Sequence, residues 1–530
     1  MVMLPLKNIT IGAALRDAAK KYPDRPAIEY CGSRWTYLDV DRTTDHLAAG
    51  FLALGLEEGT HVGIWSEMNA QMLLTYYALQ KIGAVTVMLS TVLSEDKLLD
   101  QLRQTDCEWL MVGNFYSHTD VHDICVRAER DADITVVRMT EKGGWDELDL
   151  RAVDAAGASM SMRTLGAAKE LVRPESDSMI LFTSGTNGQP KAVVSTHYSR
   201  MNSGIQQAGD LHATCEDRFC VMLPMFHCFS ISANILAALA VGGCLVLAED
   251  RHSATVLRLL DEKKCTIFNA VPTAFHSMMA REDFDQYDLS HLRTGIIAGG
   301  TYTVDQFVKV EEKFGMKVLS SLGQTECTAG LTVCNMDDSL EVRSTTVGHF
   351  MNHVEYKIAH LETGDALGEG EMGEICVRGY LVMKEYYKDP EQTAKTVDAD
   401  GWCHTGDLGW VDGNGNLHLS GRLKELVIRA GENISPKEVA DVLMGDPRVA
   451  DVKVIGVKDE HYGEQLCACI VVAQGETLSE EQARQIVAEK LESFKVPAHV
   501  LFFKQLPYST TGKILLGQLQ GMVEQQGLTP

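Results

Sequence analysis

The stretch Leu181-Phe-Thr-Ser-Gly-Thr-Asn-Gly-Gln-Pro-Lys191 joins the end of an apolar strand to a loop of hydroxyls and glycines. Glycines let a backbone approach a polyphosphate and point N–H groups at it, and hydroxyls donate to phosphate oxygens. Lys191 adds a cation. The spacing differs from the G-x4-G-K-[ST] of a Walker A loop. A polar surface turn is the alternative, but the combination favours a phosphate-binding loop after a buried strand.

Helices and strands alternate on both sides of this loop. Predicted strands at 62–65 and 84–89 flank a predicted helix at 70–82, and the same rhythm returns between 179 and 318. Such alternation predicts a mostly parallel sheet with helices on both faces, which is an α/β fold. Short strands and glycine-rich turns between 354 and 419 predict a small β-barrel-like subdomain.

The length of 530 residues is too great for one domain. After Arg422 the pattern becomes mixed and compact, with a predicted helix from Pro436 followed by strands and a further helix. We therefore predict a large N-terminal α/β domain over residues 1–423, which includes the β subdomain. A small, mobile α+β C-terminal domain is predicted over residues 424–530.

Composition excludes several classes of protein. Hydrophobic residues make up 45% and charged residues 23% of the chain, which is typical of a globular protein. The net charge of -25 argues against binding to nucleic acid or to an anionic membrane. The 14 cysteines lack the spacing of zinc sites, so we expect reduced thiols. We see no signal peptide and no apolar run long enough to span a membrane, and we expect a cytoplasmic protein.

Four further motifs follow the phosphate loop. They are Gly323-Gln-Thr-Glu326, His404-Thr-Gly-Asp407, Gly421-Arg-Leu-Lys424 and Pro507-Tyr-Ser-Thr-Thr-Gly-Lys513. Together with the loop, they resemble, in the same order, the signatures of the adenylate-forming (AMP-binding) superfamily. This superfamily includes acyl-CoA synthetases, carrier-loading adenylation domains and firefly-type luciferases. The resemblance covers essentially the whole chain and implies the same fold and chemistry.

The resemblance implies an ATP site with a catalytic lysine. Lys513 would offset the repulsion between a substrate carboxylate and the α-phosphate, and Glu326 would hold Mg²⁺. Thr186 and His227 complete the expected catalytic set. The residues expected to contact the nucleotide are Thr183, Ser184, Gly185, Thr186, Asn187, Gly188, Lys191, Gly299, Gly300, Gly323, Gln324, Thr325, Asp407, Arg422, Lys424, Gly431 and Lys513.

Several of these residues have simpler interpretations. Glu326 could be a solvated loop acid, and Arg422 could form a surface ion pair instead of contacting the ribose with Asp407. His227 falls where the family has an aromatic residue or histidine beside the acyl pocket, and a packed core histidine is the alternative. A solvated surface lysine is the default interpretation of Lys513, and the surrounding Pro-x4-Gly-Lys motif is what favours a catalytic role.

The chain also departs from the family pattern. Asn187 and Ala192 replace a threonine and a glycine that are commoner in the phosphate loop, and Leu322 stands where many relatives carry an aromatic residue that stacks on adenine.

Two other patterns imitate known motifs. We interpret Gly368–Gly373 as a turn and not a dinucleotide fingerprint, and Asp412–Asn416 as a hairpin turn and not a calcium loop.

The resemblance implies two half-reactions. A carboxylic acid and Mg·ATP give an acyl-adenylate and pyrophosphate. The C-terminal domain then rotates about Lys424, and a thiol takes the acyl group. We expect a free-standing enzyme that uses CoA and an apolar acid, either medium-chain fatty or aryl. A separate acyl carrier protein as acceptor is the alternative, and a non-catalytic nucleotide-binding protein is a third interpretation.

Overall fold

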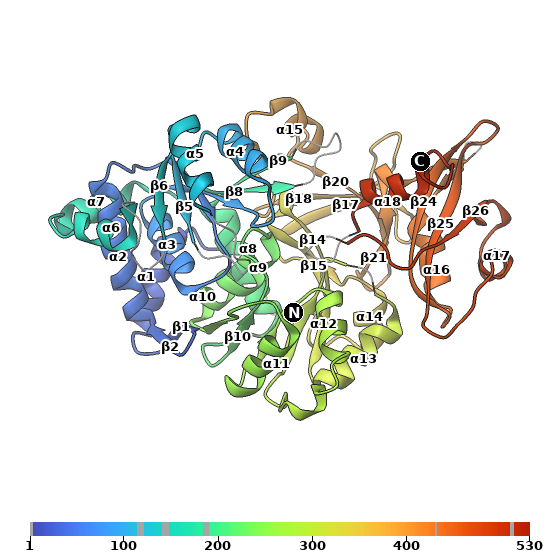
Figure 1. The fold of residues 1–530 in the computed structure, drawn as a ribbon, viewed down its shortest axis with the longest axis horizontal. Helices are drawn as coiled ribbons and strands as arrows, with labels where there is room; N and C mark the ends of the chain where they lie inside the picture. The colour runs from blue at the N-terminus through green and yellow to red at the C-terminus, as the bar shows by residue number, and fades with distance from the viewer. Residues whose placement is uncertain are drawn as a thin grey trace.

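The computed structural model describes residues 4–113, 121–139, 148–183, 190–300, 302–429, 432–508 and 514–530. Two large sheets and a small antiparallel sheet are built from residues up to Arg422, and a further sheet follows (Figure 1). The predicted α/β class, with a large N-terminal part and a small C-terminal part, is confirmed. The exact boundary at 423/424 stays a prediction.

The eight-stranded sheet contains the phosphate-loop strands. Its order is β19-β9-β8-β4-β3-β5-β6-β7. Strands β3 to β8 run parallel to one another, whereas β9 runs antiparallel to β8 and β19 runs antiparallel to β9. The strands are β3 (His61–Trp65), β4 (Val85–Leu89), β5 (Trp109–Val112), β6 (Thr135–Arg138), β7 (Leu148–Asp149), β8 (Asp177–Thr183), β9 (Lys191–Thr196) and β19 (Glu385–Tyr386).

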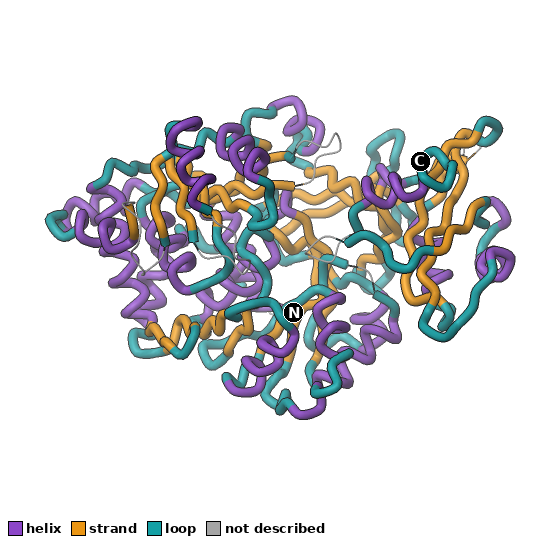
Figure 2. The backbone as a smooth tube through the Cα atoms, viewed as in Figure 1, coloured by secondary structure: helices purple, strands orange, loops and turns teal. Residues whose placement is uncertain are grey.

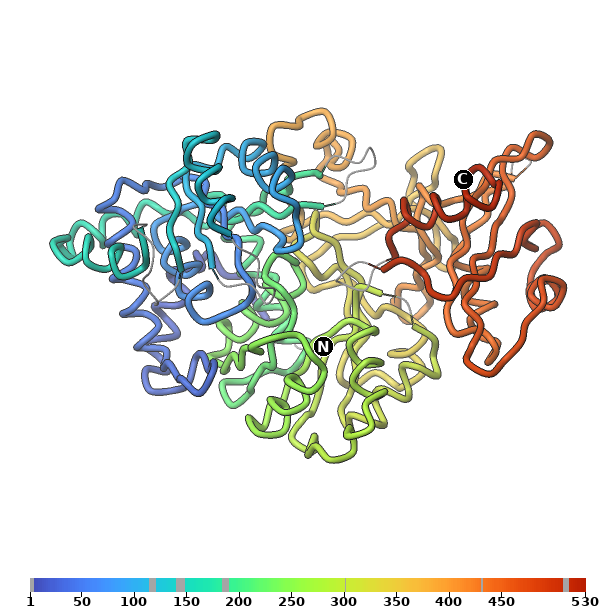
Figure 3. Tube along the Cα trace, viewed as in Figure 1, coloured from blue at the N-terminus to red at the C-terminus, as the bar shows by residue number. Residues whose placement is uncertain are grey.

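The nine-stranded sheet combines the middle of the chain with an N-terminal hairpin. Its order is β16-β15-β14-β13-β12-β10-β11-β1-β2. Strand β1 pairs with β11 in parallel, so the blue N-terminal hairpin joins the green sheet in Figure 3. The strands are β1 (Pro26–Tyr30), β2 (Ser33–Thr36), β10 (Arg218–Val221), β11 (Cys244–Leu247), β12 (Ile267–Phe268), β13 (Thr294–Ile297), β14 (Lys317–Gln324), β15 (Ala329–Val333) and β16 (His349–Phe350).

Two helices lie between the large sheets. Helix α3 (Ala70–Lys81) contacts β4 and β1, and α8 (His197–Asp210) contacts β8, β9 and β15. Nearly every residue of both helices is buried, so neither presents a polar face to water. A π-helical segment, η1 (Ile231–Leu236), packs on α8.

Figure 2 shows the other α-helices of the N-terminal part in purple. They are α1 (Ile11–Lys21), α2 (Tyr37–Ala53), α4 (Glu95–Gln104), α5 (His122–Ala132), α6 (Leu150–Gly157), α7 (Met162–Leu171), α9 (Cys228–Ser230), α10 (Ala237–Val241), α11 (Ser253–Glu262), α12 (Pro272–Met279), α13 (Val304–Phe314), α14 (Leu340–Thr345) and α15 (Pro390–Thr396). Within the described ranges, no helix combines the length and the apolar character needed to cross a membrane.

The small β subdomain is a four-stranded antiparallel sheet with β17 and β21 at its edges. Its strands are β17 (Val354–Ala359), β18 (Gly373–Gly379), β20 (Cys403–Val411) and β21 (Leu417–Arg422). Residues 368–372 lead into β18, and residues 412–416 connect β20 to β21. Both patterns that imitate other motifs are therefore turns, as predicted.

The C-terminal sheet lies at the orange-to-red end of the molecule in Figure 1. Its longest pairing is the hairpin of β24 and β25. The elements are β22 (Val427–Arg429), β23 (Glu432–Ile434), α16 (Pro436–Met444), β24 (Val449–Asp459), β25 (Gly463–Val472), α17 (Glu480–Ala488), β26 (His499–Phe502) and α18 (Leu516–Glu524).

The packing of α8 on η1 requires a glycine. A Cβ at Gly204 would lie 2.5 Å from the Leu236 Cβ and 2.7 Å from the Leu236 carbonyl carbon. We predict that Gly204→Ala lowers the free energy of unfolding by about 1–3 kcal/mol, because overpacking forces backbone shifts. The matched control is Gly166→Ala in α7, where a Cβ meets nothing within 4 Å. Urea unfolding checks both, and equal midpoints for the two variants would contradict the prediction.

Candidate active site

The two ends of the phosphate loop lie side by side. Thr183 is the last residue of β8 and pairs directly with Lys191, the first residue of β9. The Thr183 hydroxyl is buried and has no hydrogen-bond partner within the described part of the chain. A buried hydroxyl left unpaired is costly, so this group suits an incoming acceptor such as a phosphate oxygen. The expected contacts Ser184, Gly185, Thr186, Asn187 and Gly188 lie outside the described residues.

A buried tyrosine connects the phosphate loop to the expected metal ligand. Lys191 Nζ donates to the Tyr386 hydroxyl at 2.9 Å and lies 4.3 Å from the centroid of its ring. The same hydroxyl donates to Glu326 Oε1 at 2.8 Å. Burial, and next the Glu326 carboxylate, raises the pKa of the Tyr386 phenol, so it stays protonated as a donor. Lys191 and Glu326 are thus both hydrogen-bonded to one hydroxyl.

The turn that carries Thr325 and Glu326 is tightly built. It joins β14 to β15, and a Cβ at Gly323 would lie 1.5 Å from the Ala329 carbonyl oxygen. No side chain fits there, which explains the glycine. Thr328 adopts a left-handed conformation with φ 54, and its carbonyl oxygen accepts the Ser232 hydroxyl at 2.6 Å. The turn is therefore fixed before any ligand binds.

Three predicted segments follow strands that run in one direction through the nine-stranded sheet. His227 comes after β10, Gly299 and Gly300 come after β13, and Thr325 comes after β14. Ligands of open α/β sheets bind outside the carboxyl ends of such strands.

The His227 segment meets the Thr325 turn directly. Thr325 Oγ1 donates to the sulfur of Cys228, the neighbour of His227, at 3.8 Å. His227 also precedes the π-helical segment η1, an irregularity that is frequent at functional sites. The His227 ring lies 4.6 Å from that of Phe226, centroid to centroid. The structure therefore places His227 beside the Thr325 turn.

Asp407 and Arg422 face each other across β20 and β21. They are register partners, and Arg422 Nε donates to Asp407 Oδ1 at 2.9 Å. Asp407 is only 2% exposed, and its Oδ2 has no hydrogen-bond partner within the described residues. Burial raises the pKa of the Asp407 carboxyl, and Arg422 opposes that shift. One carboxylate oxygen therefore remains to accept a hydroxyl of a ligand.

The three sheets bring these groups together. The Glu326 carbonyl oxygen accepts the Met383 N–H at 2.7 Å, just before β19. The Cys327 sulfur lies 3.8 Å from the sulfur of Cys403, at the start of the strand that carries Asp407. Lys191, Glu326 and Asp407, from three different sheets, therefore belong to one neighbourhood.

Of the C-terminal candidates, Lys424 lies within the described residues. Lys424 lies in an exposed 3-10 turn, η4 (Leu423–Glu425), immediately after β21. Gly431 and Lys513 lie outside the described residues. Their assigned roles, like that of Gln324 at the end of β14, stay predictions.

Tyr386 was not among the residues predicted from the sequence. Its neighbour Tyr387 is also aromatic and donates its hydroxyl to Asp106 at 2.7 Å, so residue type does not distinguish the two. What selects Tyr386 is the pairing of β19 with β9, where it lies opposite Val193. No local pattern in the sequence predicts that pairing.

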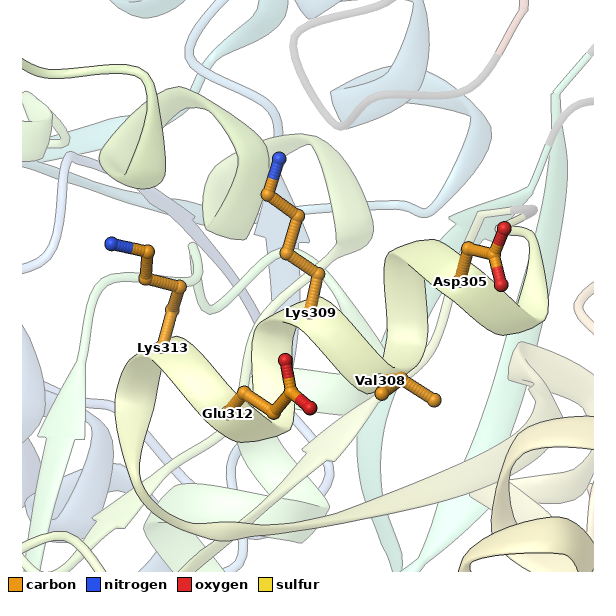
Figure 4. A pocket seen from close by; sticks show the side chains of 5 residues that line it. All are labelled: Asp305, Val308, Lys309, Glu312 and Lys313. Atoms are coloured by element: carbon orange, nitrogen blue, oxygen red, sulfur yellow. The ribbon is translucent and has the colours of Figure 1, made fainter. Parts of the chain in front are cut away.

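A hollow on the surface of α13 is not a second candidate. It is lined by Asp305, Val308, Lys309, Glu312 and Lys313 (Figure 4). All of these side chains come from one helix, and none belongs to the motifs that meet around Glu326.

The unpaired oxygen of Asp407 makes a direct prediction about nucleotide binding. Asp407→Asn should weaken ATP binding by about 10- to 100-fold, because hydrogen bonds to a charged group contribute about 1.5–3 kcal/mol. Isothermal titration calorimetry measures this loss. Asp400→Asn, at an exposed position before the same strand, is the control and should bind ATP like the parent. Equal affinities for both variants would exclude the assigned contact.

Family comparisons agree with this arrangement. Residues 15–387 match the AMP-binding enzyme family, and residues 438–513 match the C-terminal domain of AMP-binding enzymes. YngI of Bacillus subtilis (strain 168), named provisionally as an acyl-CoA synthetase, is 34% identical over 535 residues, which cover 97% of this chain and 96% of YngI. The mitochondrial medium-chain acyl-CoA ligase of Rattus norvegicus is 30% identical over 543 residues, which cover 98% of this chain and 88% of that protein.

The fold is also shared with a solved structure. The crystal structure of ATP-bound MatB from Rhodopseudomonas palustris matches with a TM-score of 0.85 and 25% identity, and the match covers 97% of this chain and 99% of MatB. The family models together match most of the chain, and they include the strands and turns that carry Lys191 and Glu326. The chain therefore belongs to the AMP-binding family of adenylate-forming enzymes and is an enzyme of the acid–thiol ligase type.

Proposed function

We propose that this protein is an ATP-dependent carboxylic acid:CoA ligase. It would activate an apolar acid as an acyl-adenylate with release of pyrophosphate, and then form the acyl-CoA thioester. The observation that carries the proposal is the Lys191–Tyr386–Glu326 connection. It joins a cation of the phosphate loop to a carboxylate that suits a hard metal ion, and this pairing fits a bound Mg·ATP better than a simple anion.

The described residues fit Mg²⁺ as the cofactor. Glu326 is a single carboxylate whose Oε1 is held by Tyr386, and Mg²⁺ in phosphate-transfer sites uses one or two carboxylates together with substrate phosphates and water. Glu326 would hold the ion, which neutralises phosphate charge when it is bound. Asp407 and Arg422 would hold the ribose, and Thr183 would donate to a phosphate oxygen.

In the first half-reaction, the carboxylate oxygen of the acid attacks the α-phosphorus, and the bond to pyrophosphate breaks. Thr325 would donate to the α-phosphate, and Lys513 would offset the repulsion between the two anions. His227, beside Thr325, would border the acyl group. In the second half-reaction, the thiol of CoA attacks the acyl carbonyl, and AMP leaves.

An apolar acid is the proposed substrate. The π-helical segment that follows His227 presents buried apolar side chains, among them Ile231, Ala233 and Ile235. A relative that covers nearly the whole chain is named a medium-chain acyl-CoA ligase. CoA is the proposed acceptor because both named relatives are acyl-CoA enzymes. An acyl carrier protein has no such support.

The reaction is tested with Mg·ATP and a pooled panel of fatty and aryl acids, with and without CoA. Pyrophosphate release and the masses of the thioesters are measured. We expect acid-dependent release and a CoA thioester of a medium-chain or aryl acid. An adenylate without any CoA thioester would shift the acceptor to a carrier protein. ATP binding without any acid-dependent release would contradict the catalytic proposal.

The bridging hydroxyl provides a specific test of the site. Tyr386→Phe keeps the ring beneath Lys191 but removes the hydrogen bonds to Lys191 and Glu326. We predict that kcat/KM for acid-dependent pyrophosphate release falls by about 10-fold or more, because bonds to charged groups contribute about 1.5–3 kcal/mol. Tyr387→Phe, which removes only the hydroxyl bonded to Asp106, is the matched control. If both variants behave alike, the bridge has no catalytic role.

Lys513 should act in only one half-reaction. We predict that Lys513→Ala slows adenylation by about 10²–10³-fold, because a cation that stabilises the transition state is lost. Thioester formation from added acyl-adenylate should be unchanged. Lys504→Ala, at an exposed position shortly after β26, is the control. Stopped-flow measurement of each half-reaction separates them, and an equal loss in both would be inconsistent with the assigned role.

A further inference from the structure

Among the residues that the structure describes, Glu374, Cys376 and His404 form a group of metal-ligand side chains that the proposed reaction does not use. Glu374 and Cys376 are alternate residues of β18, and Cys376 is the register partner of His404 on β20. Side chains two residues apart on a strand share a face, so this arrangement directs all three to one side of the sheet.

The distances within the group suit a tetrahedral ion. His404 Nδ1 lies 2.8 Å from Glu374 Oε2 and 3.5 Å from the sulfur of Cys376, and all three donor atoms lie within 4.8 Å of one another. Ligand atoms around a tetrahedral Zn²⁺ are about 3.3–3.8 Å apart, given metal–ligand bonds of about 2.0–2.3 Å. The Glu374–His404 separation must widen by a fraction of an ångström, and the Glu374–Cys376 separation lies within 4.8 Å.

A fourth residue, Asp398, lies next to the second ring nitrogen of His404. Asp398 Oδ2 lies 3.5 Å from His404 Nε2, the ring nitrogen that faces away from Cys376. Histidines that bind metals commonly donate their second ring N–H to a carboxylate, which fixes the ring and makes it a better ligand. The His404 and Asp398 side chains are 29% and 34% exposed, so an ion can enter from this side.

We propose that Glu374, Cys376 and His404 form a binding site for a thiophilic divalent cation of the Zn²⁺ class, with Asp398 as the supporting carboxylate. The ion binds Glu374 Oε2, the Cys376 sulfur and His404 Nδ1, and water fills the fourth position. It displaces the thiol proton of Cys376, and the one ring proton of His404 lies on Nε2, toward Asp398, so one proton leaves for each ion bound.

The thiol proton is present before the ion binds. Burial, and next Glu374, raises the pKa of the Cys376 thiol to about 12. The ion must therefore displace this proton, and its binding should weaken as the pH falls. The other oxygen of Glu374 accepts the Gly406 N–H at 3.0 Å, which places the site beside the residue that precedes Asp407 on β20.

This site differs chemically from the Glu326 site. A sulfur and an imidazole ligand favour Zn²⁺ or Co²⁺ over Mg²⁺, which prefers oxygen ligands. Glu326 offers only a carboxylate beside the phosphate loop. The two sites should therefore be selective for different ions, and Mg²⁺ should not compete at the Cys376 site.

The test uses Co²⁺ as the probe, added to the full-length, chelator-treated protein in the presence of excess Mg²⁺. We expect saturation at one ion per chain, with a near-ultraviolet band from thiolate-to-cobalt charge transfer. Cys376→Ser should abolish the band and weaken binding by about 10-fold or more. Asp398→Asn should keep the band but weaken binding by about 10- to 100-fold. Cys31→Ser, at an exposed cysteine, is the control and should match the parent.

Circular dichroism and thermal unfolding establish that each variant is folded before titration. If Cys376→Ser does not fold, His404→Gln, at a partly exposed position, takes its place and should weaken binding to the same degree. A parent protein without a saturable charge-transfer band would overturn the proposal. So would a band that persists unchanged in Cys376→Ser, because the thiolate would then come from another cysteine.

Discussion

The arrangement of the active site depends on the Tyr386 hydroxyl. It lies between Lys191 at one end of the phosphate loop and Glu326 on the turn after β14, and it bonds to both. Because Tyr386 is 2% exposed, its ring cannot move aside without opening the core. The short pairing of β19 with β9 therefore sets the separation of a cation and a carboxylate that belong to different sheets.

Asp407 illustrates the electrostatic consequence of such a site. A nearly buried carboxylate with a single cationic partner is expensive to keep ionised, because its second oxygen has no donor among the described residues. A ligand hydroxyl that donates to this oxygen would offset the cost. Thr183 presents the same situation with a hydroxyl. Polar groups already oriented in a buried site need little reorganisation when the ligand arrives, which is the basis of electrostatic preorganisation.

Much of this architecture is predictable from the sequence because it is local. The alternation of helices and strands predicts the parallel sheets, and the short motifs predict the positions of Lys191, Glu326 and Asp407. What depends on pairing between distant segments is not predictable in this way. The β1–β2 hairpin joins β11 far along the chain, and Tyr386 reaches its place through β19. The meeting of Cys376 with His404 across β18 and β20 is of the same kind.

The central claim is that the acid is activated as an adenylate at the site around Glu326. It is tested most directly with a substrate acid labelled with oxygen-18 in both carboxylate oxygens, supplied with Mg·ATP and CoA. We predict that the AMP produced carries one oxygen-18 atom and that the thioester keeps the other, because the carboxylate oxygen bonds to the α-phosphorus and leaves with AMP. Unlabelled AMP, or ADP as the nucleotide product, would contradict the account.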